Sequence, residues 1–548
     1  MIEKILFVEV YNQILRRYPD DINLAYMASY MREKGFEVCL NSINSSLKEL
    51  NEFIEYKPDI IAFNLYKFDT TNLDFQNLEL VIRFISEMRK KLPGVIICCG
   101  GVLSTFESEL ILRKISFIDY IINGEAEYVF LDLVTKLNQG EKPDAINGIS
   151  YRKSDEIITN KSRKTLADMD KLPHPARDML LKNNHKIARV ITSRGCMGNC
   201  SFCFTKNFWG KWRGRSPESV VDEIEMIVNQ YNVDIFNNND NSYEDSDVPF
   251  DTNRMLQIAN KIIERELNVL YFVNMRVNTY KRLSQSDMEI LTKSGMINVF
   301  LGVETGNEDD LKLYNKLQNI QDNDESIRFY RDAGIFVDIG FINFNPYSSI
   351  TGLRKNISFL ERHGFDSFKT ILSAVDIFEG TRLFNKIKKD HLLIKNSIFD
   401  KDGFRIQKDA VEKLFNFLMN GIKLWNEEFF NNCVNISGFT NEQWFIQNII
   451  KVHMERHNNY SEFDLINRHI ASINEVKAEV NARNSKWFKE LLDLADTGWN
   501  DVYAIHITEK ILSKKWIKDT EEQLSVKNRK LIYDLYKRNS LYSEYLYL

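Results

Sequence analysis

The chain has 548 residues, of which 44% are hydrophobic and 27% are charged. This length exceeds what one hydrophobic core usually supports, so we expect two to four domains. The 72 Lys and Arg residues nearly balance the 77 Asp and Glu residues, which argues against nucleic acid as the main partner. The first residues lack a secretion signal, and no apolar run is long enough for a membrane span. We therefore expect a cytoplasmic protein with no membrane contact.

Residues 1–140 alternate short β-branched runs with amphipathic helical segments. The five strand-like runs are KILFVEV, EVCLNSI, DIIAFNLY, GVIICCGG and IDYIING. This alternation predicts an α/β domain of the Rossmann-like, doubly wound type, with five parallel strands. Ligands of such sheets bind at the carboxyl ends of the strands. Those ends carry the segments 64–68, 100–105 and 124–127.

Residues 141–185 are predicted to be a linker that contains a small hairpin. From residue 186 to 385 the alternation resumes, with six strand candidates: IARVITS, VDIFNNN, LYFVNMR, INVFLGV, FVDIGFINF and FKTILSAVDIF. Six β/α units predict a partial (β/α)6 barrel with its chemistry at the strand ends. Residues 386–548 lose the strand pattern and predict a C-terminal α-helical domain. We expect this helical domain to cap the barrel mouth.

Three of the seven cysteines lie within eight residues, directly after the first barrel strand, in the segment ITSRGCMGNCSFCF. They are Cys196, Cys200 and Cys203. A structural zinc site or an ordinary iron-sulfur cluster takes four protein ligands, so three thiolates leave one position free. No histidine follows the loop until His363, so a zinc site lacks an evident fourth ligand. We predict a [4Fe-4S] cluster with three protein ligands, and the alternatives are zinc or a chance grouping of structural cysteines.

The C-x3-C-x2-C spacing, with the aromatic Phe202 before the last cysteine, resembles the signature of radical S-adenosylmethionine (radical SAM) enzymes. The segments RGRSPESVVDEIE, FNNNDNSYE, FLGVETGNEDDLKLYNK, GFINFNP and DIFEGTRLF follow in the order of radical SAM enzymes with an N-terminal cobalamin-binding domain. GGVLST and INGEAE resemble that domain itself. The resemblance covers about residues 1–385 and is to the class B methylase-like group, which includes C-methylases and P-methylases of natural-product biosynthesis.

The resemblance implies that the three cysteines hold the cluster and that its open iron chelates S-adenosyl-L-methionine. It also assigns cofactor contacts to side chains at the barrel strand ends and in the loop. These are Phe202, Asp240, Arg276 and Glu304. A solvated carboxylate is the alternative for Glu304, and a structural salt bridge is the alternative for Arg276. The four remaining cysteines are scattered, which predicts a single cluster.

The resemblance also implies a cobalamin site in the first domain, although the domain lacks the D-x-H-x-x-G motif. No histidine precedes His174, so something other than histidine, or water, would meet the lower face of cobalt. The resemblance places Tyr66, Lys67 and Phe68 beneath the corrin. It places Ser104 and Thr105 at the nucleotide tail, beside Gly100 and Gly101. Gly124 and Glu125, at the end of the last strand, are further cofactor-binding candidates. The alternative is a domain that has lost its cofactor and serves as a scaffold.

These features predict an enzyme that moves a methyl group from methylcobalamin to an unactivated carbon or phosphorus of a natural-product or peptide substrate, through a 5′-deoxyadenosyl radical. The alternative reaction is a rearrangement, cyclisation, epimerisation or redox step that uses the radical without a methyl transfer. A third hypothesis is a non-catalytic, cluster-bearing scaffold. The expected partners are a small-molecule or peptide substrate and a reductase that supplies low-potential electrons.

Overall fold

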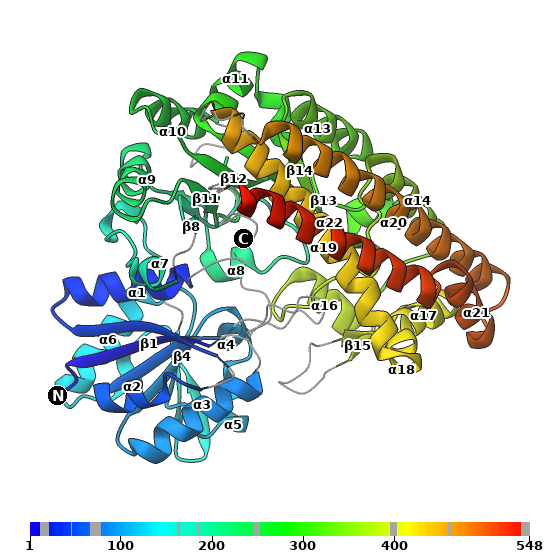
Figure 1. Ribbon diagram of the computed structural model, residues 1–548. Coiled ribbons are helices and arrows are strands. Elements are labelled where there is room, and N and C mark those ends of the chain that lie inside the picture. Colours follow the sequence, from blue (N-terminus) through cyan, green and yellow to red (C-terminus); the bar gives the residue numbers. More distant parts are fainter. Residues whose placement is uncertain are drawn as a thin grey trace.

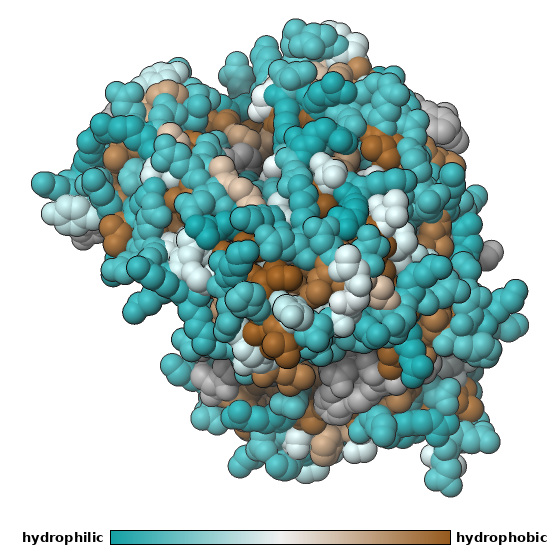
Figure 2. Space-filling view, turned by 90° about the vertical axis from the view of Figure 1, so that its right-hand side faces the viewer, coloured by the Kyte–Doolittle hydropathy of each residue, from teal (hydrophilic) through white to brown (hydrophobic). Residues whose placement is uncertain are grey.

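The computed structural model describes residues 1–10, 21–44, 47–65, 78–161, 165–183, 186–244, 252–394, 403–456, 458, 460 and 462–538. Its elements form an N-terminal sheet domain, a second parallel sheet surrounded by helices, and a C-terminal helical region (Figure 1). No helix among these residues is both long enough and apolar enough to cross a membrane. On the face shown in Figure 2, apolar residues gather near the centre and hydrophilic residues surround them.

The N-terminal domain is built on a seven-stranded sheet in the order β2-β1-β3-β4-β5-β6-β7. The strands are β1 (Lys4–Val10), β2 (Glu37–Ile43), β3 (Ile60–Asn64), β4 (Ile96–Gly100), β5 (Tyr120–Ile122), β6 (Ile149–Lys153) and β7 (Glu156–Thr159). The first five are parallel, as predicted. The hairpin β6–β7, which was predicted to lie in the linker, extends the sheet antiparallel to β5. The strand order reverses between β1 and β3, where doubly wound folds bind ligands.

Helices cover both faces of this sheet: α1 (Ile22–Glu33) and α6 (Glu127–Asn138) on one face, and α2 (Leu50–Tyr56), α3 (Leu78–Lys91) and α5 (Ser108–Lys114) on the other. Successive strand side chains point to opposite faces. Accordingly, Ile5 and Phe7 pack with α1 and α6, whereas Leu6 and Val8 pack with the other three helices. The strands are therefore apolar on both sides, which explains their continuous hydrophobic runs.

The second sheet is parallel and has the order β14-β13-β12-β11-β8. Its strands are β8 (Ile187–Val190), β11 (Ile235–Asn238), β12 (Leu270–Met275), β13 (Met296–Glu304) and β14 (Phe336–Phe341). Five of the six predicted strands are present. The sixth prediction was wrong, because Ser367 caps a short helix, α15 (Phe368–Ile371), by accepting a hydrogen bond from the Thr370 amide. Only one parallel bridge, between Phe344 and Ala374, continues the sheet in the described residues.

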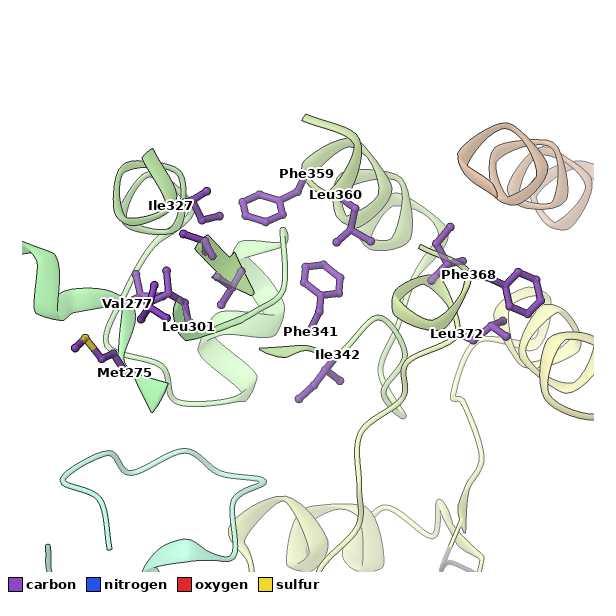
Figure 3. Packing of buried hydrophobic residues seen from close by; sticks show 14 of the residues in the cluster. Met275, Val277, Leu301, Ile327, Phe341, Ile342, Phe359, Leu360, Phe368 and Leu372 are labelled. Atoms are coloured by element: carbon purple, nitrogen blue, oxygen red, sulfur yellow. The ribbon is translucent and has the colours of Figure 1, made fainter. Parts of the chain in front are cut away.

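The outer face of the partial barrel is a continuous apolar core (Figure 3). The helices that supply it are α9 (Pro217–Tyr231), α10 (Asn253–Glu264), α11 (Gln285–Ser294), α13 (Ile320–Asp332) and α14 (Ile350–His363). Phe341 of β14 stacks on Phe359 of α14, with ring centroids 6.1 Å apart. Leu301 of β13 and Ile327 of α13 are fully buried in the same core. Each such side chain contributes about 1.5–3 kcal/mol to the stability of the fold.

The described part of the C-terminal region is largely helical, as predicted, and its capping of the barrel mouth stays a prediction. Its long helices are α19 (Glu427–Arg456), α20 (Phe463–Thr497) and α22 (Lys514–Lys537), and they run side by side across the barrel (Figure 1). Their apolar residues form a cluster with Ile187, Ile235 and Leu270, the first residues of three barrel strands. These three helices therefore cover the amino end of the sheet, whereas Phe415 packs against Phe344, which follows β14 at the other end, with ring centroids 5.3 Å apart.

Candidate functional site at the domain junction

The cysteine loop leaves β8 through a short antiparallel pair, β9 (Ser193–Arg194) and β10 (Arg213–Gly214). Gly195 follows with φ of +87°, and a Cβ atom there would lie 2.7 Å from the carbonyl oxygen of Lys211. Only glycine tolerates both this backbone conformation and this close approach. The sequence therefore fixes a sharp turn directly before Cys196.

The three thiols of the loop are half-buried, and none of the three forms a disulfide bond. The Sγ atom of Cys196 accepts a hydrogen bond from the Gly198 amide at 3.2 Å. A Cβ atom on Gly198 would lie 3.2 Å from that sulfur and 3.9 Å from the Sγ atom of Cys200, so glycine keeps the space between the two sulfurs clear. Two sulfurs therefore border this space, and a donor set of three soft thiols in one loop fits an iron-sulfur cluster.

A buried ion pair lies beside the thiols. Glu304 ends β13 at a bulge with φ of +68°, and its Oε1 accepts from the Nζ atom of Lys316 at 3.2 Å. Burial alone would lower the pKa of Lys316, but Glu304, Cys200 and Cys196 outweigh burial and raise it. Burial raises the pKa of the Cys200 thiol, and the Lys316 cation opposes that effect. A fixed positive charge thus stands between the carboxylate and the sulfurs.

Arg276 reaches the same loop from the end of β12. Its Cδ atom would lie 3.9 Å from a Cβ atom on Gly198, and its Nε donates to Glu244 at 3.2 Å. Glu244 is fully buried and also accepts from the Thr279 hydroxyl at 3.0 Å. The salt bridge expected as the alternative role of Arg276 is therefore present, and it holds the side chain beside the cysteine loop.

Two predicted site residues hold the loop in place. Asp240 is buried, and its carboxylate accepts from the amides of Thr192 and Ser193 at 2.7 and 3.0 Å. Phe202 packs edge-on against Tyr314, with ring centroids 5.3 Å apart. Both contacts fix the loop to the barrel. A direct contact of Asp240 or Phe202 with S-adenosylmethionine stays a prediction.

The N-terminal domain presents the predicted glycine-rich turns at the carboxyl ends of β4 and β5. Gly101 has φ of +96°, and a Cβ atom there would lie 2.7 Å from the carbonyl oxygen of Leu65. The hydroxyls of Ser104 and Thr105 both donate to the Gly101 carbonyl, at 3.1 and 2.8 Å. Thr105 also accepts from the Gly124 amide at 3.0 Å. These residues therefore hold two turns together, and their contact with a nucleotide tail stays a prediction.

These turns line a cavity that also reaches the barrel side of the junction. Its walls include Asn23, Asn64, Gly101, Gly124, Arg194 and Trp209. Gly100 lies beside it, since its Cβ position would be 3.5 Å from the Asn64 Oδ1 atom. The Oδ1 atom of Asn23 is buried without a hydrogen-bond partner. A cavity with glycine walls and an unsatisfied amide suits a polar cofactor tail. Tyr66, Lys67 and Phe68 lie outside the described residues, and their predicted position beneath a corrin stays a prediction.

A buried ion-pair network joins this cavity to the cysteine loop. Arg194, two residues before Cys196, contacts Glu127 at 2.6 Å and stacks over the Trp209 ring at 5.0 Å. Glu125 pairs with Arg213 at 2.7 Å. Burial alone would raise the pKa of Glu127, but Arg194 outweighs burial and lowers it. The network therefore sets the spacing between the two halves of the site.

Sequence reasoning missed three charged residues here: Glu244, Lys316 and Arg194. Glu244 and Lys316 are each the last residue of a segment that resembles the family, so the sequence could have indicated that they lie near the site. Nothing in the sequence indicated that both would be buried next to a partner. Arg194 lies directly before the motif, where an arginine normally suggests an exposed strand end.

Comparisons with known proteins agree with this organisation. Residues 190–346 match the radical SAM superfamily, and residues 15–134 match the B12 binding domain. These matches confirm the predicted cofactor set of a [4Fe-4S] cluster, S-adenosylmethionine and cobalamin.

Related sequences are moderately similar. The chain is 27% identical to an anaerobic magnesium-protoporphyrin IX monomethyl ester cyclase of Rubrivivax gelatinosus over 58% of each chain. It is 25% identical to an uncharacterized methyltransferase of Pyrococcus horikoshii over 68% of this chain and 79% of that protein. The chain spans little more than half the length of the cyclases it matches.

Two solved structures share the fold. The cobalamin-dependent S-adenosylmethionine radical enzyme OxsB with aqua-cobalamin bound superposes with a TM-score of 0.67, at 18% identity, over 95% of this chain and 84% of that chain. The radical S-adenosylmethionine methyltransferase TsrM from Kitasatospora setae superposes with a TM-score of 0.59, at 15% identity, over 71% of this chain and 76% of that chain.

Proposed function

We propose that this chain, which joins a B12-binding domain to a radical SAM domain, is an enzyme that methylates an unactivated carbon or phosphorus of a small-molecule or peptide substrate. The observation that carries the proposal is the Arg194–Glu127 pair, which ties the cysteine loop to the wall of the cavity in the first domain. When bound, the cluster with S-adenosylmethionine supplies a 5′-deoxyadenosyl radical, and cobalamin supplies the methyl group. We place the enzyme in the cytoplasm, where such thiols are kept reduced.

The residues around the thiols have complementary charges for S-adenosylmethionine. Lys316 and Arg276 are cations beside the loop, and Glu304 is an anion at the end of β13. We assign the two cations to the carboxylate of S-adenosylmethionine and Glu304 to its amine or ribose. Gly302 and Gly340 leave room here, because Cβ atoms on them would lie 3.0 and 3.3 Å from the Glu304 carboxylate.

Replacing Lys316 with methionine is expected to weaken S-adenosylmethionine binding about 30-fold or more. The change removes one partner of a buried charged pair, which costs about 2 kcal/mol or more. Isothermal titration of the anaerobically reconstituted protein measures the affinity, and iron content shows that the cluster is intact.

Two further variants test the role of the charge. Lys316→Arg, which keeps the charge, should retain more affinity than Lys316→Met. Lys293→Met, at an exposed lysine, is the matched control. Wild-type affinity in Lys316→Met would contradict the assignment.

Product analysis tests the proposed function. Anaerobically reconstituted protein with cobalamin, excess S-adenosylmethionine and a low-potential reductant should retain a corrin absorption band. Turnover with the substrate should yield S-adenosylhomocysteine and 5′-deoxyadenosine together, because one molecule of S-adenosylmethionine methylates cobalamin and another supplies the radical. Protein that retains no corrin would contradict the proposal.

A second function is favoured by the cyclase and by 4′-phospho-dehydrooxetanocin synthase of Priestia megaterium, to which the chain is 25% identical over 70% of its length. In this alternative the radical drives a rearrangement, cyclisation, epimerisation or redox step without methyl transfer. The same assay separates the two functions, since the alternative yields 5′-deoxyadenosine without S-adenosylhomocysteine.

A further inference from the structure

The cysteine loop has one face in solvent, and cations converge on it. Met197 is 40% exposed, and Asn199, between the first two cysteines, is exposed as well. The Asn199 carbonyl accepts from the guanidinium of Arg382 and from the side-chain amide of Asn315. Its Oδ1 accepts from the Nζ atom of Lys206 at 3.4 Å. Two cationic side chains therefore lie against the outer surface of the loop.

Helix α16 (Arg382–Lys389) extends this positive surface. Its apolar residues are buried, whereas its cations are exposed, namely Arg382, Lys386, Lys388 and Lys389. The Leu383 amide donates to the Ser201 carbonyl at 2.8 Å, so the helix begins on the cysteine loop. Lys206 belongs to another short helix, α8 (Thr205–Trp209). Helices α8 and α16 both lie between the N-terminal domain and the barrel (Figure 1).

The segment after α12 (Glu308–Leu313) borders the loop on another side. Ser201 binds the carbonyls of Tyr314 and Leu313, through its amide and its hydroxyl, at 2.8 and 2.6 Å. Leu317 in this segment is 82% exposed, and the side chain of Lys312 is 78% exposed. Leu317 and Met197 therefore expose apolar surface among the cations that border the loop.

The balance of charge on this surface is positive, although the whole chain carries a net charge of −5. Lys312 has Asp309 at 3.9 Å, and Lys386 has Asp390 at 2.8 Å. Four more exposed cations add to the positive charge, namely Lys206, Arg382, Lys388 and Lys389. We name the surface formed by Met197, Asn199, Lys206, Lys312, Leu317, Arg382 and Lys386 the Asn199 patch.

We propose that the Asn199 patch is the docking site of an acidic, low-potential one-electron carrier protein. This inference rests on the proposed function, because cleavage of S-adenosylmethionine needs one electron delivered to the cluster. The step transfers one electron from the reduced centre of the carrier to the cluster and moves no other group. Opposite charges accelerate encounter. The exposed Met197 and Leu317 supply the apolar centre that a docked partner would desolvate.

The test uses the reconstituted holoenzyme and reduced flavodoxin as the probe. The triple variant Lys206→Glu, Lys312→Glu and Lys386→Glu reverses the patch and leaves the Arg382 contact with the loop in place. Stopped-flow absorbance follows cluster reduction at low ionic strength. The rate constant with flavodoxin should fall about tenfold or more and lose its salt dependence. Reversal of the exposed Lys293, Lys510 and Lys518 is the matched control and should leave the rate unchanged.

Two results would overturn the docking site. One is a flavodoxin rate in the patch variant equal to that of the control variant. The other is an equal loss of reduction by dithionite or of S-adenosylmethionine binding, which would assign the patch to the catalytic site. The reduction assay contains no substrate, so methyl transfer does not enter it. Failure of methyl transfer in the wild-type enzyme would therefore refute the proposed function and leave the docking result standing.

Discussion

Replacement of Cys200 with alanine is expected to abolish the reductive cleavage of S-adenosylmethionine. Cys200 lies in a loop whose other two thiols cannot hold the cluster in one orientation, and no histidine in the sequence stands between His185 and His363 to replace it. The loss of even an outer partner of a metal ligand costs about 10- to 100-fold. We therefore expect the rate of 5′-deoxyadenosine formation to fall by more than about 100-fold, measured by chromatography after anaerobic reconstitution.

Iron and sulfide analysis accompanies the activity measurement. The Cys200→Ala protein should bind less iron than the wild-type protein, while Cys39→Ala should match the wild type, since Cys39 lies on β2. Zinc in the wild-type loop with a complete set of four protein ligands would contradict the cluster assignment. So would cleavage activity that survives Cys200→Ala.

The cysteine loop and the presence of two successive parallel sheets could be predicted from the sequence, because both depend on local sequence patterns. The loop is contiguous, and Gly195 and Gly198 mark its turns. The parallel strands are buried on both faces, so their apolar runs stand out. The sixth barrel strand was mispredicted, because the apolar run FKTILSAVDIF resembles a strand. Ser367, directly before the run, caps a helix that the run alone did not reveal.

The parts that escaped prediction depend on contacts between distant segments. The apolar faces of α19, α20 and α22 indicated that these helices are buried, but not against which surface. Their partners are side chains at the amino ends of the barrel strands, among them Ile187 and Leu270. Likewise, Lys316 meets Glu304 only because a bulge turns the end of β13. Hydrophobic periodicity identifies a buried face and leaves its partner open.

Replacement of Arg194 with methionine is expected to destabilise the protein by about 3–5 kcal/mol at pH 7, because it leaves a buried carboxylate without its partner. Glu127 lies 2.6 Å from Arg194, and both side chains are less than a tenth exposed. Chemical denaturation followed by circular dichroism measures the loss. The double variant Arg194→Met and Glu127→Gln removes the unpaired charge and should recover part of it.

The deficit of Arg194→Met should also depend on pH. Arg194 lowers the pKa of Glu127, so the pair stabilises the wild-type fold above the ordinary glutamate pKa of about 4.3. This contribution disappears as the pH falls through the lowered pKa of the folded protein. The difference between wild type and variant should therefore shrink in acid. A difference that is small at pH 7, or constant with pH, would mean that the junction is held by packing around Trp209 rather than by this pair. Since the pair sets the spacing between the cysteine loop and the cavity of the first domain, its loss should also uncouple corrin retention from cluster content.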